Sequence, residues 1–165
     1  MAMNESSDHP DVRIPTKSAL DAIRARPDMY VGEFPTGALL MARLVETLLL
    51  LDAAPLKVAC NGAWYSLHAD RDWLMTESGV ICLDAFQRLI PLPSGGRFYD
   101  RAEVILTALA DAVATSDTTG VSWISGEPDR WPLPAGLDLS LLPQGGRIVA
   151  FHYSKHDPAG VASRS

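Results

Sequence analysis

Residues 19–32 have the sequence ALDAIRARPDMYVG, and the interpretation of the whole chain starts from this stretch. Ser18 stands directly before it and Asp21 follows three residues later, a spacing that resembles a capping box and predicts a short helix. Pro27 is expected to end that helix, because the residue before a proline avoids the α region. The segment at 29–32 should then be short and extended or turning.

A second helix is predicted downstream, from Ala38 to about Asp52, and Pro55 closes it. Its apolar residues lie on nearly every face: Leu39, Leu40, Met41, Leu44, Val45, Leu48, Leu49, Leu50 and Leu51. A helix that is apolar all round either lies buried in the middle of its domain or contributes an interface.

A β-hairpin is predicted next, from Leu56 to Ala69. Asn61-Gly62 separates two β-rich runs there, and this dipeptide is a strong hairpin signal because both turn residues are expected to take positive φ. The remaining elements are expected at 78–86 (strand), 101–115 (helix), 120–125 (strand), 128–143 (loop) and 147–153 (strand). This order predicts an α+β sandwich, a mostly antiparallel sheet with helices on one face.

The chain of 165 residues fits one domain with a core of its own. We expect residues 1–15 to form a flexible lead-in, 16–154 a single domain and 155–165 a flexible tail. Two similar passages, Pro93 to Arg97 and Pro143 to Arg147, are interpreted as turns. The other interpretation, a pair of phosphate cradles, lacks the spacing of a nucleotide loop that leads into a helix.

Composition and charge narrow the class of protein. Hydrophobic residues make up 47% of the chain and the net charge is −6, so we expect a globular fold and no direct nucleic-acid binding. Cys60 and Cys82 lie in apolar stretches and are expected to be reduced and buried. The N-terminus lacks an apolar h-region, and Arg43 and Glu46 interrupt the longest apolar stretch. These features predict a cytoplasmic protein with no membrane span.

The stretch at 19–32 resembles the opening of the ATPase domain of gyrase B and topoisomerase IV, where a helix precedes Arg-Pro-Gly-Met-Tyr-Ile-Gly. Asp28 replaces the first glycine of that signature, and Val31 replaces the isoleucine. The residues that match are Arg26, Pro27, Met29, Tyr30 and Gly32. That family belongs to the GHKL superfamily, so the resemblance implies a GHKL-like two-layer sandwich over about residues 16–154, with the signature in a structural role.

ATP hydrolysis in that family requires a general base on the long helix and an asparagine that helps to hold Mg²⁺. Alignment of the helices places Glu46 at the position of the base. The Asp and Asn that should follow it are Leu49 and Leu50 here. Because leucine cannot coordinate Mg²⁺, the resemblance implies that catalysis is lost and that core fills the former Mg²⁺ side of the cavity.

The resemblance also implies a carboxylate that accepts a hydrogen bond from the adenine amino group, followed by glycines that let the backbone approach the nucleotide. Asp70 can take the place of that carboxylate with a register slip of one residue. Arg71 and Trp73 stand where the glycines should be, and a tryptophan would crowd a base pocket. A glycine-rich lid has no room between Phe98 and Arg101.

Structural roles are the simplest for several of these residues. Glu46 stands three residues after Arg43 on a predicted helix, which favours an ion pair between them. Asp70 and Asp72 lie in a polar turn, where solvation or capping is expected first. Met29 and Tyr30 are expected to pack in the core rather than to form a ligand site.

The favoured hypothesis is a catalytically inactive GHKL-like domain that binds a protein or a small ligand and uses no cofactor or metal. One alternative is a divergent ATP-binding enzyme that employs Glu46 and Asp70 with ATP and Mg²⁺. Another is a regulator or inhibitor of a type II topoisomerase that mimics one half of its ATPase dimer. The apolar helix at 38–52 is compatible with a homo-oligomer, and Arg24 and Arg26 are either solvated or face an acidic partner.

Overall fold

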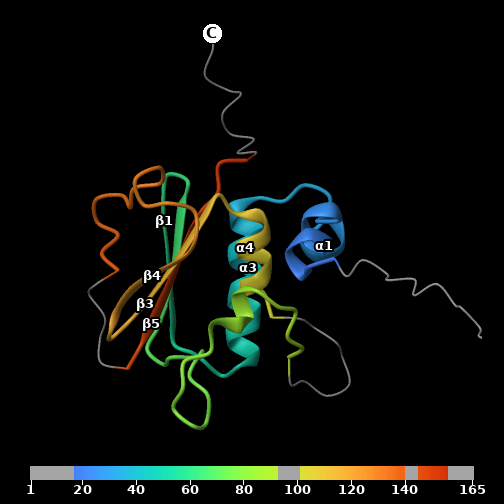
Figure 1. Ribbon diagram of the computed structural model, residues 1–165. Coiled ribbons are helices and arrows are strands. Elements are labelled where there is room, and N and C mark those ends of the chain that lie inside the picture. The colour runs from blue at the N-terminus through green and yellow to red at the C-terminus, as the bar shows by residue number, and fades with distance from the viewer. Residues whose placement is uncertain (1–16, 93–100, 140–144, 156–165) are drawn as a thin grey trace, which may run out of the picture.

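The computed structural model describes residues 17–92, 101–139 and 145–155. Its helical elements are α1 (Ala19–Ala25), α2 (Asp28–Val31), α3 (Gly37–Leu50), the 3-10 helix η1 (Leu83–Phe86) and α4 (Glu103–Leu109). Its strands are β1 (Leu56–Asn61), β2 (Trp64–Ala69), β3 (Ala112–Asp117), β4 (Gly120–Ser125) and β5 (Arg147–His152). Figure 1 shows α3 and α4 together on one side of the sheet, with α1 beyond them.

The five strands form one sheet in the order β1-β2-β5-β3-β4, and each neighbouring pair is antiparallel. The central strand β5 arrives last in the sequence and inserts between the β1–β2 hairpin and the β3–β4 hairpin. The predicted fold class, an α+β two-layer sandwich with helices on one face of an antiparallel sheet, is therefore confirmed.

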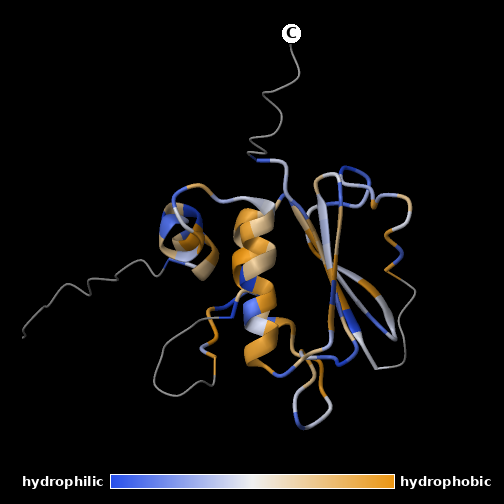
Figure 2. Cartoon of the chain, turned by 180° about the vertical axis from the view of Figure 1, so that it is seen from behind, coloured by the Kyte–Doolittle hydropathy of each residue, from blue (hydrophilic) through white to orange (hydrophobic). Residues whose placement is uncertain are grey.

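The two faces of the sheet bury different clusters, because successive side chains of a strand point to opposite sides. In β5, Val149 and Phe151 join the main core beneath the helices, whereas Ile148 and Ala150 join a second cluster on the other face. The main core also receives the inward sides of α3 and α4, which are mostly apolar in colour in Figure 2. The segment at 127–139 supplies Trp131 and Leu139 to the second cluster.

The N-terminal helix begins as the sequence predicts. Ser18 Oγ accepts a hydrogen bond from the Asp21 amide at 3.1 Å and donates one to Asp21 Oδ2 at 2.7 Å. Of the two forms predicted for 29–32, extended or turning, the structure has the second, because Asp28–Val31 forms the one-turn helix α2. Pro27, with φ −62°, is compatible with the start of a helix, and Gly32 ends this turn at φ +88°.

Helix α3 is buried on one side only. Thr36 caps it by accepting a hydrogen bond from the Leu39 amide at 3.2 Å. The side chains that face the interior recur every three or four residues and are Gly37, Leu40, Met41, Leu44, Thr47 and Leu48. This helix is therefore not buried all round. One side packs in the core, and the other side carries exposed leucines.

The predicted hairpin is present, with its turn one residue later than expected. Asn61 pairs with Trp64 as the last rung of the ladder, so Gly62 and Ala63 form the loop. Gly62 has φ +61°, and Asn61 does not have positive φ. A loop with glycine at its first central position suits the right-handed twist of the flanking strands.

Two other element predictions are wrong. The segment at 78–86 is not a strand but one isolated bridge, Met75 to Ile81, followed by η1. The helix expected at 101–115 ends at Leu109, and Ala112 to Asp117 is β3 instead. Because β3 pairs with both β4 and β5, the hydrogen bonds of the sheet outweigh the helical pattern of its alanine-rich sequence.

Both cysteines are unpaired thiols, as expected, but the prediction that they are buried is wrong. Cys60 is exposed because β1 is an edge strand whose residues after Leu56 all face solvent. Cys82 is half-buried. The turn predicted at 93–97 and the lead-in at 1–15 lie outside the described residues, as do most of the tail at 155–165 and the start of the turn at 143–147.

Candidate functional site

Glu46 lies on the exposed side of α3. Its carboxylate pairs with Arg43 Nη1 one turn earlier on the same helix, as the i, i+3 spacing predicts. About half of the Glu46 side chain is exposed, 48% by area. Glu46 therefore does not point into an enclosed site, as a general base would.

The expectation that core fills the former Mg²⁺ side of the cavity is wrong, because Leu49 and Leu50 are exposed. Leu49 is 58% exposed and Leu50 is 44% exposed, so neither plugs an interior space. The reason is helical geometry: Leu44 and Leu48 lie on the buried stripe, and each further residue turns about 100° away from it. These leucines form part of the protein surface.

Asp70 also faces away from the interior. It follows β2 directly, and its carboxylate approaches His68 Nε2 to 3.7 Å while about half of its side chain remains exposed. Ala69, immediately before it, is fully buried against the helices. The residue of this segment that faces the interior is therefore Ala69, whose side chain is only a methyl group.

Asp72, two residues further on, is the buried carboxylate of this segment, so the expectation that it is solvated is wrong. Arg147 at the start of β5 donates to it through Nε at 2.6 Å to Oδ1 and through Nη2 at 2.8 Å to Oδ2. The Leu74 amide donates to Oδ1 at 3.0 Å. Asp72 and Arg147 are both buried, with 5% and 2% of their side chains exposed. Such a two-pronged pair is the strongest geometry for a guanidinium and a carboxylate.

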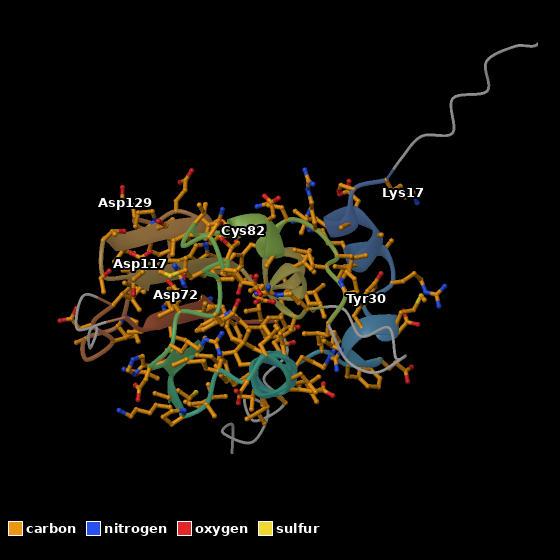
Figure 3. All side chains as sticks on the ribbon, turned by 90° about the horizontal axis from the view of Figure 1, so that it is seen from below. Lys17, Tyr30, Asp72, Cys82, Asp117 and Asp129 are labelled. Carbon is orange, nitrogen blue, oxygen red and sulfur yellow. The ribbon has the colours of Figure 1, made fainter. Side chains whose placement is uncertain are left out.

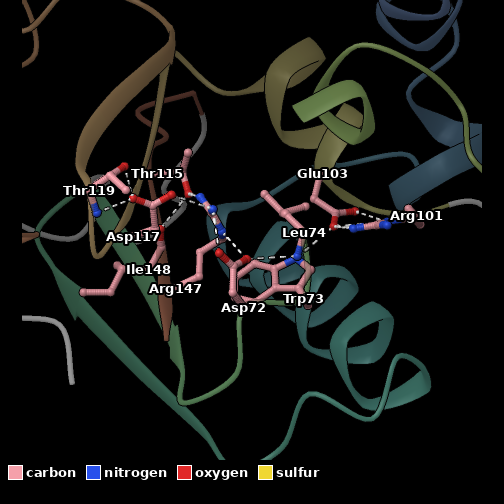
Figure 4. Close-up of polar contacts among 10 residues, drawn as sticks. All are labelled: Asp72, Trp73, Leu74, Arg101, Glu103, Thr115, Asp117, Thr119, Arg147 and Ile148. Atoms are coloured by element: carbon pink, nitrogen blue, oxygen red, sulfur yellow. Dashed lines mark hydrogen bonds and ion pairs between the residues drawn. The ribbon is translucent and has the colours of Figure 1, made fainter. Parts of the chain in front are cut away.

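Arg147 extends this network onto β3 (Figure 4). Its Nη1 donates to Thr115 Oγ1 at 3.0 Å, and its Nη2 also approaches Asp117 Oδ2 at 3.1 Å. The hydroxyl of Thr119, followed in strength by its amide and by the charge of Arg147, holds the pKa of Asp117 below its ordinary value despite partial burial. The guanidinium is therefore fixed by three residues from two segments of the chain, Asp72 after β2 and Thr115 and Asp117 on β3.

Trp73 joins a second ion pair to the same place. Its Nε1 donates to Glu103 Oε1 at 3.0 Å, and Arg101 donates to the same oxygen through Nη2 at 2.5 Å. Glu103 is fully buried at the start of α4, and Trp73 is buried beside it. Figure 4 shows Asp72 and Trp73 as the link between the two pairs. The indole thus occupies interior volume where the resemblance would place a glycine.

The expectation that Met29 of the signature packs in the core is wrong, because its side chain is 69% exposed. Tyr30 is half-buried and does pack against the core. Arg26 pairs with Asp28 through two hydrogen bonds of 3.2 and 3.1 Å, both at the surface. Figure 3 shows Tyr30 on the opposite side of the molecule from Asp72 and Asp117, so the signature takes no part in the network.

The chemistry open to the Asp72 network is limited by its own hydrogen bonds. Each oxygen of Asp72 already accepts from a donor, and the carboxylate is enclosed. Within residues 17–92, 101–139 and 145–155, no three His, Cys, Asp or Glu side chains are grouped so as to hold a metal ion. The network therefore stabilises the junction of β2, β3 and β5. The buried Asp72 carboxylate is not open to a hydrogen-bond donor from a ligand.

Sequence reasoning missed Arg147, Glu103 and Arg101. The Arg101–Glu103 pair is local, and its spacing across a helix start was a usable signal. The partner of Asp72 lies 75 residues away, and only the sheet order brings it near. Gly146, next to Arg147, allows the chain to pass close to the end of β2, because a Cβ there would lie 2.7 Å from the Ala69 carbonyl oxygen.

No protein-family model matches the chain, and no curated protein matches it either. Among the described residues, no helix is both long enough and apolar enough to cross a membrane.

Proposed function

We propose that this protein is a catalytically inactive GHKL-like domain of the gyrase B type that acts as a binding module for a protein or a small ligand in the cytoplasm. The observation that carries the proposal is the buried pair of Asp72 and Arg147 beside Trp73. It lies in the segment where the resemblance expects an adenine-binding carboxylate and glycines, and it fills that segment with internal contacts.

Asp70, the carboxylate that the resemblance assigns to adenine, is about half exposed outside the core. A nucleotide base that used the buried Asp72 instead would have to compete with Arg147 for it. Displacing the guanidinium would leave a buried charge without its partner, which typically costs about 3–5 kcal/mol. Trp73 would also have to leave its hydrogen bond to Glu103. This cost argues against adenine binding in the manner of the family.

The residues of α3 at which the resemblance would place the Mg²⁺ site support the same conclusion. Glu46 is exposed and paired with Arg43, and the exposed side chains at 49 and 50 are hydrocarbon. Hard oxygen ligands are what Mg²⁺ requires. The net charge of −6 further supports a partner other than nucleic acid.

The test is isothermal titration calorimetry with a non-hydrolysable ATP analogue and Mg²⁺, together with a phosphate-release assay. We expect no saturable heat and equal, background phosphate release from the wild type and from Glu46→Gln. Saturable Mg²⁺-dependent binding would overturn the proposal. Turnover that disappears in Glu46→Gln would establish the divergent enzyme instead.

A further inference from the structure

A cavity of about 400 Å³ lies at the other end of β5 from Arg147, and the Asp72 network takes no part in it. Its walls come from the α1–α2 turn, the loop before α3, the end of α4 and the residues after β5. This volume is within the range of about 300–1,000 Å³ that is usual for small-molecule pockets. The cavity is therefore large enough to hold a small organic ligand.

Two cationic side chains line the cavity, Arg24 from α1 and Lys155 from the segment after β5. Arg24 Nε donates to the Ala108 carbonyl oxygen at 3.0 Å, so its guanidinium is held at the end of α4. A guanidinium fixed through Nε still has two terminal nitrogens, which can donate together to a carboxylate. The lining is positive although the chain as a whole is acidic.

The rest of the lining is apolar and aromatic. Pro27, Pro35 and Leu109 contribute hydrocarbon, and Tyr153 contributes a ring. The Tyr153 hydroxyl donates to the Pro35 carbonyl oxygen at 2.9 Å, which fixes the ring against the loop before α3. Burial and, secondarily, the charge of Asp111 raise the pKa of Tyr153, so the phenol stays neutral.

Nearby carboxylates do not cancel this positive charge. Of the residues that line the cavity, all within the described chain, none is acidic. Asp21 lies 3.6 Å from Arg24 Nη1, but both side chains are more than half exposed, which weakens their attraction. Asp111 already accepts hydrogen bonds from the Ser154 amide, the Ser154 hydroxyl and His152.

We propose that this cavity binds a small organic acid whose carboxylate pairs with Arg24 and Lys155 and whose apolar body lies against Pro27, Leu109 and Tyr153. The inference rests on the proposed role as a binding module, and it gives that module a ligand class. An apolar pocket with a few fixed polar groups is the usual design of a small-molecule site.

The test is a titration of isotope-labelled protein with phenylacetate, followed by amide chemical shifts in NMR spectra. We expect saturable shifts at Ala108, Leu109 and Tyr153. Phenylacetamide, the neutral counterpart of the same size, should bind at least about tenfold more weakly, the scale of losing a charge-assisted hydrogen bond. Equal binding of the two compounds, or no shifts at these amides, would overturn the proposal.

Variants separate the two cationic groups. Arg24→Gln and Lys155→Gln should each weaken phenylacetate binding by about tenfold, whereas Arg26→Gln should leave it unchanged. Arg26 is the matched control because it ends the same helix but pairs with Asp28 outside the cavity. Since Arg24→Gln also removes the bond to Ala108, Lys155→Gln keeps the test valid if the first variant unfolds. Unchanged affinity in Lys155→Gln and in a folded Arg24→Gln would refute the site.

The outcome also separates this inference from the proposed function. An ATP analogue with Mg²⁺ that shifts the amides of Asp72 and Trp73 would contradict the inactive-domain proposal and leave the organic-acid site standing. Absence of phenylacetate shifts at Leu109 and Tyr153 would remove the organic-acid site and leave the inactive-domain proposal standing.

Discussion

Arg147 is the residue whose replacement we expect to be most damaging to the interior. Arg147→Met keeps much of the side-chain volume but leaves the Asp72 carboxylate buried without its charged partner. The free energy of unfolding should fall by about 3–5 kcal/mol, as for other broken buried ion pairs. Urea unfolding monitored by circular dichroism measures this loss.

A surface arginine and a double variant provide the controls. Arg26→Met breaks an exposed pair with Asp28 and should change the free energy of unfolding by less than about 1 kcal/mol. Asp72→Asn combined with Arg147→Met removes both charges, so its cost should be smaller than the sum of the two single changes. Additive losses would show that Asp72 and Arg147 do not depend on each other.

The residues that could be predicted from sequence are those with local partners. The Arg43–Glu46 pair follows from helical spacing, and the Ser18–Asp21 cap follows from a spacing of three residues in the sequence. The charge of Asp72 gave no sign of burial, because its partner is set by the position of β5 in the sheet. The exposure of Met29 and Leu49 could not be predicted from the sequence either, because it depends on which residues the neighbouring elements cover.

At the scale of elements, Gly37 determines how closely α3 approaches the sheet. A glycine in a helix normally costs about 1 kcal/mol relative to alanine. At Gly37, however, a Cβ would lie 2.2 Å from Tyr65 Cε2, and the Tyr65 ring is stacked on Phe151 with centroids 5.2 Å apart. Gly37→Ala should therefore destabilise the protein by about 1–3 kcal/mol through overpacking.

Thermal unfolding of Gly37→Ala and of Ala42→Gly measures this effect. Ala42 lies on the exposed side of α3, so Ala42→Gly should show the ordinary loss of about 1 kcal/mol. A Gly37→Ala variant that melts above the wild type would mean that Tyr65 moves aside at little cost, and the close approach would then not limit the packing of α3.

Element boundaries were predictable where the signals were local. The helix predicted from Ala38 to about Asp52 is observed as Gly37–Leu50, and the hairpin predicted from Leu56 to Ala69 is present with its turn shifted by one residue. The helix predicted at 101–115 failed at its second half because Ala112 to Asp117 gains two strand partners that lie later in the sequence. Propensity within the segment carries no information about those partners.

At the scale of the whole molecule, Asp111 joins the start of β3 to the chain after β5. Burial raises the pKa of Asp111, but hydrogen bonds from the Ser154 amide and hydroxyl and from His152 outweigh burial and hold it below the ordinary value. A lowered folded-state pKa adds stability above the unfolded-state value of about 3.9, and this stability is lost as pH falls through the folded-state pKa.

Asp111→Asn should remove that part of the acid sensitivity. The difference in free energy of unfolding between wild type and Asp111→Asn should be constant near neutral pH. It should shrink as pH falls from about 4 toward the folded-state pKa. Denaturant unfolding at a series of pH values measures this difference. A gap that stays constant through the acid range would show that the Asp111 carboxylate is not stabilised by its partners.

The order of elements along the chain was sufficient to predict one antiparallel sheet with helices on one face. The cover on the other face was not predictable, because the segment at 127–139 has no periodic pattern and was expected only to be a loop. Its attachment depends on single contacts. Trp131 lies over His152 with centroids 4.5 Å apart, and Trp64 Nε1 donates to the Pro132 carbonyl oxygen at 3.1 Å.

Trp64→Phe tests whether this cover opens independently of the sandwich. Phenylalanine keeps an aromatic ring beside Trp123 and His152 but cannot donate to Pro132. A lost hydrogen bond of this kind costs about 1 kcal/mol, which corresponds to roughly five- to tenfold faster amide exchange in the segment that opens. Hydrogen exchange should therefore rise within 127–139 and stay unchanged in β2, β5 and α3. Equal acceleration in all of them would mean that the cover and the sandwich unfold as one cooperative unit.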